Sequence, residues 1–281
     1  MATVTPVVLV HGFWHGSWCW TRVSEELAAR QIPSVAVDLA GHGLKSVPPQ
    51  SRWDRPFDPQ RYAGEPSALA GITASSAAAE LVEQLRRIGR GRPCVLVAHS
   101  MSGAVATAVA EQAPELVAEL VYVTAFAPVS GLPAGAYIPR PENAGEQVSA
   151  HLVADPFAVG ALRIDPGDRA RHQAVRETFY QDVDEATATA AIALLSPDGP
   201  AGVAGEAITV TAQRYGTVGH TYVVCTQDNV IPVALQRLFV TEIDAVSLKP
   251  TTVVELDASH SPFLSQPAAL ADAVQAAVSG S

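Results

Sequence analysis

The chain has 281 residues, of which 48% are hydrophobic and 16% charged, and its formal net charge is −10. A chain of this length buries roughly 75% of its unfolded surface, and large α/β folds of this size often form one unit. The acidic balance argues against a nucleic-acid or anionic-membrane partner, because such partners are bound by basic patches. Length and charge therefore predict a globular protein that does not act on a polyanion.

Three cysteines are present, Cys19, Cys94 and Cys225, and two of them lie in apolar, strand-like runs. An odd number of buried thiols is typical of a reducing compartment. The N-terminal segment lacks the basic and apolar regions of a secretory signal, and no apolar run reaches the ~18 residues of a membrane span. We therefore expect a soluble, cytoplasmic protein with no membrane partner.

Short apolar segments alternate with longer, Ala- and Leu-rich ones along most of the chain. The expected strands cover residues 7–10, 35–37, 94–98, 119–123, 221–225 and 252–256. The expected helices cover residues 18–30, 76–88, a stretch from Ser102, 233–239 and 267–278. Continuous apolar strands separated by helices are typical of an α/β fold, with a mostly parallel sheet covered on both faces.

Two stretches interrupt this alternation. Residues 45–74 are rich in Pro, Gly and Arg, and are interpreted as a long ordered loop. Residues 128–219 lack the strand and helix alternation, but contain candidate helices at 168–180 and 184–195. An insertion after one core strand is most simply a cap over the active site. We therefore divide the chain into a core, residues 1–127 and 220–281, and a cap, residues 128–219.

The strongest local signal is a serine between an apolar strand and a helix, in the run VLVAHSMSG at residues 95–103. This is the context of a nucleophile elbow, in which small residues two before and two after the serine let the backbones approach. Ala98 and Ser102 occupy those positions around Ser100. A serine at such a turn can also serve only as a helix N-cap. Ser102 is the rival hydroxyl, but its position favours packing against the turn.

A nucleophilic serine needs a base, and His260 is the best placed of the eight histidines. It follows the expected strand at 252–256, and Asp228 follows the expected strand at 221–225. The order Ser, Asp, His is the one used by hydrolases with a nucleophile elbow. Asp228 would hold the imidazole tautomer and stabilise the imidazolium. Asp257 is the alternative acid, but it lies too close to His260 along the chain to reach the far ring nitrogen easily.

A glycine directly after the first strand suggests the oxyanion hole. The backbone N–H groups of Phe13, which follows Gly12, and of Met101 would converge on the developing oxyanion. The other histidines of these segments are assigned elsewhere: His11 to holding the loop, His15 to lining the pocket, and His99 to internal packing.

Further pocket residues are weaker candidates, because aromatic side chains belong to a core more often than to a ligand site. The candidates for substrate binding are Gly12, Trp14, His15, Tyr137, Phe157 and Phe179. The sequence has no metal-binding spacing of Cys and His, no acidic calcium loop, and no glycine motif for phosphate or dinucleotide. We therefore expect neither a metal nor a cofactor.

Four separated motifs together resemble those of the methylesterase and hydroxynitrile lyase branch of the α/β-hydrolases. They are HGFWHGSWCW at residues 11–20, AHSMSG at 98–103, CTQDNVIP at 225–232 and SHSPFLSQP at 259–267. The run FYQD at 179–182 also resembles that family's cap. The resemblance implies triad roles for Ser100, Asp228 and His260, and oxyanion roles for Phe13 and Met101. It also makes a homodimer reasonable.

The chain departs from this family in three places. Ala98 and Ser102 replace the glycines of the elbow, and residues 45–74 are longer than the family's usual connection. The cyanohydrin-cleaving members resemble each other in having a threonine and a lysine where this chain has Gly12 and Ser261. A lysine would stabilise departing cyanide, which Ser261 cannot do. The resemblance therefore favours ester hydrolysis through an acyl-enzyme.

The predicted function is hydrolysis of a small or medium carboxylic ester. Three alternatives stay open at this point. The first is a cofactor-free lyase on the same fold, and the second is a tailoring enzyme that acts on a natural product. The third is a non-catalytic relative that recognises a small ligand without cleaving it.

Overall fold

The computed structural model describes residues 5–280. The expectation that no secretory signal precedes the first strand concerns in part residues 1–4, which lie outside that range. The six-stranded sheet has the order β2-β1-β3-β4-β7-β8, and all its pairings are parallel. Its strands are β1 (Val7–Val10), β2 (Ser34–Val37), β3 (Cys94–Ser100), β4 (Val117–Ala125), β7 (Gly219–Cys225) and β8 (Thr252–Leu256). The predicted α/β fold with a mostly parallel sheet is confirmed.

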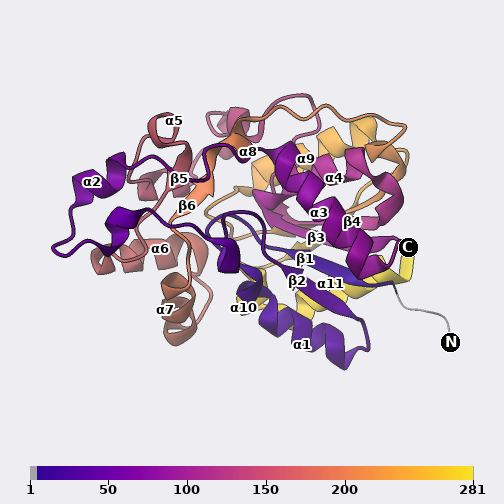
Figure 1. Cartoon of the computed structure of the whole chain (residues 1–281). Coiled ribbons are helices and arrows are strands. Elements are labelled where there is room, and N and C mark those ends of the chain that lie inside the picture. The colour runs from indigo at the N-terminus through magenta and orange to yellow at the C-terminus, as the bar shows by residue number, and fades with distance from the viewer. Residues whose placement is uncertain (1–4, 281) are drawn as a thin grey trace.

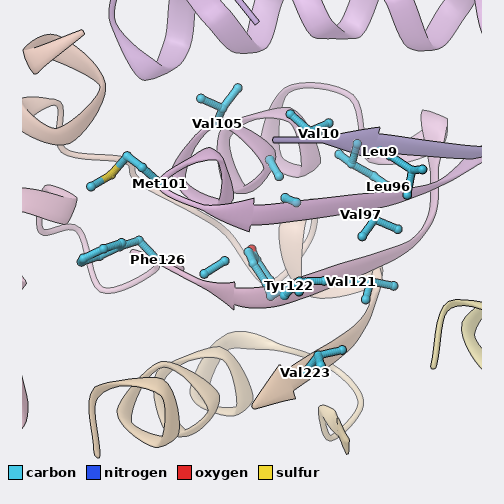
Figure 2. Packing of buried hydrophobic residues seen from close by; sticks show 14 of the residues in the cluster. Leu9, Val10, Leu96, Val97, Met101, Val105, Val121, Tyr122, Phe126 and Val223 are labelled. Atoms are coloured by element: carbon cyan, nitrogen blue, oxygen red, sulfur yellow. The ribbon is translucent and has the colours of Figure 1, made fainter. Parts of the chain in front are cut away.

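The central strands are buried because both faces of the sheet are covered. Every residue of β1 and β3 is buried, as their uninterrupted apolar runs predict. Figure 2 shows side chains of β1, β3, β4 and β7 packed across neighbouring strands, among them Leu9, Leu96, Val121 and Val223. Burying one such side chain stabilises the fold by about 1.5–3 kcal/mol. This packing fixes the strand ends from which the candidate site is built.

Helices cover both faces of the sheet (Figure 1). On one face lie α1 (Thr21–Ala29) and α11 (Pro267–Gly280), which pack against each other. On the other lie α3 (Ala74–Gly89), α4 (Ser102–Gln112) and α9 (Val233–Val246). The helix expected at residues 18–30 begins instead as a 3₁₀ turn at Ser17–Trp20.

The segment between β4 and β7 forms a separate layer beyond the sheet (Figure 1). Its elements are α5 (Pro156–Val159), β5 (Ala161–Arg163), α6 (His172–Phe179), α7 (Glu185–Ala193), β6 (Asp198–Pro200) and α8 (Ala201–Gly205). The helices expected at 168–180 and 184–195 correspond to α6 and α7. The antiparallel pair of β5 and β6 is absent from the expectation, because three-residue strands leave no periodic pattern.

The expectation that residues 45–74 form only a loop is wrong, since they contain α2 (Pro59–Gly64). The side chain of Asp58 accepts hydrogen bonds from the N–H groups of Gln60 and Arg61, and Pro59 occupies the first turn, so a helix begins here. The hydroxyl of Tyr62 donates to the carbonyl of Ile164 at 2.7 Å. This segment therefore packs on the layer between β4 and β7.

Three further findings concern residues 5–280. None of the helices in this range has the length and apolar character that crossing a bilayer requires. Cys19, Cys94 and Cys225 are all free and buried. The last short helix, α10 (Pro262–Ser265), follows the loop after β8 and contacts α11.

Candidate active site

Ser100 stands at the end of β3, in the turn that leads into α4. Its φ of 56° lies in the left-handed region, which non-glycine residues rarely adopt. Such strain costs about 1–3 kcal/mol and persists where the surrounding structure enforces it. The backbone carbonyl of Ser100 accepts a hydrogen bond from the N–H of Phe126 at 3.0 Å, which ties the turn to the end of β4. This is the geometry predicted for a nucleophile elbow.

Small residues allow the close approaches that this turn requires. A Cβ on Gly12 would lie 2.6 Å from the Cβ of Ser100, and one on Gly103 would lie 2.2 Å from the carbonyl oxygen of Phe126. Ser102 tolerates its side chain because its hydroxyl donates to the carbonyl of His99 at 2.7 Å. The glycine that the elbow needs on this side is therefore Gly103, one residue after the expected position.

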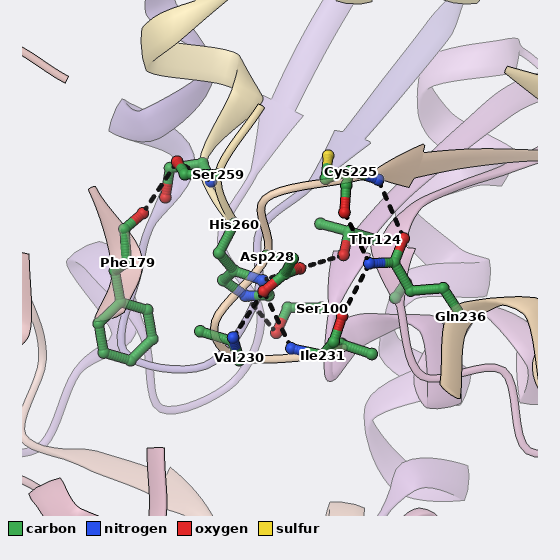
Figure 3. Close-up of polar contacts among 12 residues, drawn as sticks. Ser100, Thr124, Phe179, Cys225, Asp228, Val230, Ile231, Gln236, Ser259 and His260 are labelled. Atoms are coloured by element: carbon green, nitrogen blue, oxygen red, sulfur yellow. Dashed lines mark hydrogen bonds and ion pairs between the residues drawn. The ribbon is translucent and has the colours of Figure 1, made fainter. Parts of the chain in front are cut away.

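The three predicted triad side chains meet at the carboxyl ends of β3, β7 and β8 (Figure 3). Nε2 of His260 lies 3.0 Å from Oγ of Ser100, and Nδ1 lies 2.8 Å from Oδ2 of Asp228. Since a carboxylate only accepts hydrogen bonds, Nδ1 carries the proton in the neutral ring and Nε2 is left to accept from the serine. The arrangement can take a proton from Ser100 and return it to a leaving group.

The carboxylate of Asp228 is held by four donors. Oδ1 accepts from the backbone N–H groups of Val230 at 2.6 Å and Ile231 at 2.9 Å. Oδ2 accepts from His260 and from the hydroxyl of Thr124 (Figure 3). Thr124 was not among the predicted site residues, and the signal that marks it is a hydroxyl among apolar residues at the end of β4. Its φ of 36° is unusual for a β-branched residue.

Asp257, the alternative acid, has hydrogen-bond partners other than His260, whose Nδ1 is bonded to Asp228. Its Oδ1 accepts from the hydroxyl of Thr226 at 3.0 Å and from the side-chain amide of Gln227 at 2.9 Å. It therefore braces the loop after β7.

Four other histidines are buried around the elbow, and none has the environment of a base. Burial lowers the pKa of His11 and of His15 to about 3, and that of His42 to about 4. Burial, together with the neighbouring His260, also holds the pKa of His99 well below its usual range. His99 uses Nε2 to donate to the backbone carbonyl of His260 at 2.8 Å. The internal role predicted for His99 agrees with this contact.

The loop after β1 carries the first predicted oxyanion donor. Gly12 lies so close to Ser100 that a Cβ on it would be 2.6 Å from the Cβ of the serine. The backbone of the next residue, Phe13, therefore lies beside the elbow, in which Met101 directly follows Ser100. His11 supports the loop, as predicted, by donating from Nδ1 to the carbonyl of Gly12 at 2.8 Å. His15 supports it from the other side, since its Nδ1 donates to the carbonyl of Phe13 at 2.9 Å.

The ring of His15 also connects this loop to the layer between β4 and β7. Its Nε2 accepts a hydrogen bond from the hydroxyl of Tyr180 at 2.8 Å. His15 is only 1% exposed. It was expected to line the pocket, but the structure gives it a bracing position instead.

The predicted aromatic pocket residues fall into two groups. The ring centre of Phe179 lies 5.9 Å from that of His260, so Phe179 lies beside the triad, and Trp14 packs against Phe179 with its ring centre 5.9 Å away. Tyr137 packs 4.8 Å from Phe239 and donates to the carboxylate of Glu242. Phe157 is 98% exposed on α5. The structure brings neither Tyr137 nor Phe157 to the triad. The prediction failed for these two residues because aromatic character alone does not determine where a side chain points.

The layer between β4 and β7 contacts the loops that carry the predicted acid and base. Ser100 is only 8% exposed, and His260 only 1%. The side-chain carboxylate of Asp182 accepts from the backbone N–H of Ser259 at 2.8 Å, and the side-chain amide of Asn229 donates to the carbonyl of Glu177 at 2.9 Å. Residues 177–182 are thus hydrogen-bonded to both loops that carry the predicted acid and base.

Sequence comparison places these residues in a known family. A model of the alpha/beta hydrolase family matches residues 7–273. Methylesterase 7 of Arabidopsis thaliana is 28% identical over 265 residues, which cover 92% of this chain and 91% of the relative. A pyrethroid hydrolase of Sphingobium wenxiniae is 29% identical over 284 residues, which cover 97% and 87%.

Solved structures of other proteins have the same fold as this chain. A crystal structure of a pyrethroid hydrolase has a TM-score of 0.75 and 25% identity, and the match covers 97% of this chain and 96% of that one. The crystal structure of polyneuridine aldehyde esterase, with a TM-score of 0.74, 22% identity and coverage of 98% and 99%, supports the fold alone. The resemblance to methylesterases, first seen in four motifs, is confirmed. The chain belongs to the alpha/beta hydrolase family.

Proposed function

We propose that this protein is a serine-dependent hydrolase of small or medium carboxylic esters. The observation that carries the proposal is the unbroken chain of hydrogen bonds from Ser100 through His260 to Asp228. Curated relatives that span nearly the whole chain are named methylesterases and a pyrethroid hydrolase, which supports ester chemistry.

The hydrogen bonds suggest the order of proton transfers. Nε2 of His260 takes the proton of Ser100 as Oγ attacks the ester carbonyl, and Asp228 stabilises the imidazolium. The backbone N–H groups of Phe13 and Met101 stabilise the negative oxygen of the tetrahedral intermediate. His260 then returns the proton to the leaving alcohol, which leaves an acyl group on Ser100. A water molecule deprotonated by His260 hydrolyses that acyl-enzyme, and Ser100 is regenerated.

We further propose that residues 128–219 act as a cap. The low exposure of Ser100 and the hydrogen bonds from residues 177–182 to both catalytic loops support this role. Because Tyr62 of α2 is hydrogen-bonded to Ile164 of this segment, we expect α2 to move with the cap. Substrate entry would then require the cap to shift, and Trp14 and Phe179 would contact the bound ester.

The remaining assignments are proposals of the same kind. The substrate partner is a small-molecule ester. Three free, buried thiols support a cytoplasmic location. A homodimer is proposed from the family resemblance alone, and its direct test is the molar mass in solution.

The first experiment measures release of p-nitrophenolate from p-nitrophenyl acetate and butyrate. Wild-type protein is compared with Ser100→Ala, and with Ser102→Ala as the matched control at the neighbouring hydroxyl. Loss of the nucleophile is expected to reduce turnover by about 10⁴-fold or more, whereas Ser102→Ala retains most of it. Equal rates in wild-type and Ser100→Ala protein would contradict the proposal.

A second measurement separates ester hydrolysis from lyase chemistry. After rapid mixing with p-nitrophenyl butyrate and acid quenching, intact-protein mass spectrometry should detect a butyryl group on wild-type protein and none on Ser100→Ala. A lyase that uses His260 only as a base would form no such adduct. The structure favours the first outcome because Ser261 offers no positive charge to a departing cyanide.

A further inference from the structure

A cavity of about 980 Å³ lies between α2 with its preceding loop and the layer between β4 and β7. One wall comes from residues 52–62, and the other from residues 152–153 and 165–171. None of the predicted active-site residues lines it. Its volume is that of a site for a small organic molecule.

The cavity gathers positive charge on an acidic protein. Four of the chain's 18 basic residues line it, together with two acidic residues. The arginines are Arg52, Arg55, Arg169 and Arg171, and the acids are Asp165 and Asp168. The carboxylate of Asp168 lies 3.4 Å from Nε of Arg171, and that of Asp165 accepts from the backbone N–H of Gly167 at 2.9 Å. The cavity therefore has an excess of guanidinium groups over carboxylates.

Two of these guanidinium groups are available to an anion. Among the residues that the structure describes, the exposed side chain of Arg169 has no hydrogen-bond or ion-pair partner. Arg52 lies with its guanidinium carbon 5.4 Å from the ring centre of Trp53, a contact that leaves its N–H groups free to donate. A guanidinium matches a carboxylate through two parallel hydrogen bonds.

The same cavity exposes aromatic surface. Trp53 is 60% exposed and Phe57 40% exposed, although side chains of this size are usually more buried. Both line the cavity, and Phe57 packs 5.5 Å from the ring of Tyr62. An aromatic ligand would therefore find a stacking surface beside the arginines.

Arg163, which is fully buried, links the two walls of the cavity. Its guanidinium forms two hydrogen bonds with the carboxylate of Asp198, at 2.7 and 2.8 Å. It also donates to the backbone carbonyls of Tyr62 at 2.6 Å and Glu65 at 2.7 Å. Because these contacts join one wall to the other, the cavity is preformed, and a ligand need not pay for ordering it.

We propose that this cavity binds a small aromatic carboxylate, with its ring against Trp53 and its carboxylate on Arg52 and Arg169. The site is a binding site only, since its lining offers no nucleophile paired with a base. It is separate from Ser100 and does not depend on the esterase proposal.

The test is calorimetric titration of the full-length protein with 1-naphthoate, with the neutral 1-naphthalenemethanol as the matched ligand. One molecule of naphthoate should bind per chain, at least about tenfold more tightly than the alcohol, and the difference should shrink as salt is added. Arg52→Gln, Arg169→Gln and Trp53→Ala should each weaken binding by about tenfold. Arg87→Gln, at an exposed arginine on α3, should leave affinity unchanged.

A Ser100→Ala protein separates this site from the active site. It should bind naphthoate as wild-type protein does, whatever the outcome of the esterase assays. The proposal is overturned if Ser100→Ala abolishes binding, if the alcohol binds as tightly as the acid, or if the double variant Arg52→Gln/Arg169→Gln binds with unchanged affinity. Unfolding temperatures of all variants would confirm that each is folded.

Discussion

The hydroxyl of Thr124 donates to Oδ2 of Asp228, the same carboxylate oxygen that accepts from Nδ1 of His260. Thr124 thus acts on the candidate base through the carboxylate and touches no reacting atom. Its contact fixes the direction in which Asp228 presents its charge to the imidazole.

We expect Thr124→Val to lower kcat for p-nitrophenyl butyrate by about tenfold, since a hydrogen bond to a charged group contributes about 1.5–3 kcal/mol. KM should change little, because Thr124 does not reach the substrate. Thr124→Ser keeps the hydroxyl and should restore most of kcat. Steady-state kinetics of the two variants check this, and equal kcat values in both would contradict a role for the hydroxyl donor.

Tyr180→Phe should impair the oxyanion loop without removing a catalytic group. The change deletes the donor to Nε2 of His15 and leaves a buried acceptor unsatisfied, at a cost of about 1–3 kcal/mol in the free energy of unfolding. Because His15 also holds the carbonyl of Phe13, kcat should fall several-fold. Urea unfolding and esterase kinetics measure the two effects.

Tyr137→Phe is the matched control for that experiment. This change removes a comparable hydrogen bond, to Glu242, from a residue that lies away from the oxyanion loop. It should lower stability and leave kcat unchanged. A fall in kcat equal to that of Tyr180→Phe would indicate a general loss of folded protein, and would argue against a specific role for His15.

Asp198→Asn should destabilise the fold strongly, because it removes the charge opposite the buried guanidinium of Arg163. Breaking one side of a buried ion pair typically costs about 3–5 kcal/mol. The exposed pair of Arg237 and Glu255 serves as the control, since Glu255→Gln should cost less than about 1 kcal/mol. Urea midpoints give both values, and similar losses for the two pairs would contradict the assigned importance of Arg163.

Stability should fall as the pH is lowered from about 6.5, with the loss extending to about 3. Burial lowers the pKa of His11 and His15 to about 3, and of His42 and His220 to about 4. In the unfolded chain these imidazoles take up protons near pH 6.5, so acid favours unfolding. Each histidine contributes about 1.4 kcal/mol per pH unit to the slope of the unfolding free energy against pH.

His220 offers a way to isolate one proton of this effect. It lies away from the triad, stacked 4.4 Å from the ring of Tyr215. His220→Gln should reduce the slope of unfolding free energy against pH, between about 6.5 and 4, by the contribution of one histidine. Denaturant unfolding at several pH values measures the slope, and an unchanged slope would contradict the lowered pKa of His220.

The sequence was sufficient to predict those parts of the site that local patterns encode. Ser100, Asp228 and His260 each follow a strand whose apolar run is visible in the chain, so their meeting at one edge of a parallel sheet was predictable. The direction of a side chain within the cap was not. Phe157, in a helix capped by Asp155, is exposed to solvent, whereas Phe179 is buried. The residues next to each phenylalanine in the sequence do not predict this difference.

Contacts between distant segments were equally beyond the sequence. The bond between Thr124 and Asp228 joins residues 104 positions apart, and it depends on a left-handed threonine that no local rule predicts. The ion pair of Arg163 and Asp198 depends on three-residue strands, which are too short to show a period. In each case tertiary packing, rather than local propensity, decides the conformation.

The contact between Gly12 and Ser100 also limits which side chains residue 12 can carry. The motif resemblance associates threonine at the position of Gly12 with cyanohydrin cleavage, but a Cβ here would lie 2.6 Å from Cβ of Ser100 and 2.8 Å from Nδ1 of His99. Exchanging Gly12 for threonine would therefore force the backbone of the elbow apart before any new chemistry was gained. A variant with threonine at residue 12 would therefore need a second change, in the path of the loop after β1, to keep the elbow intact.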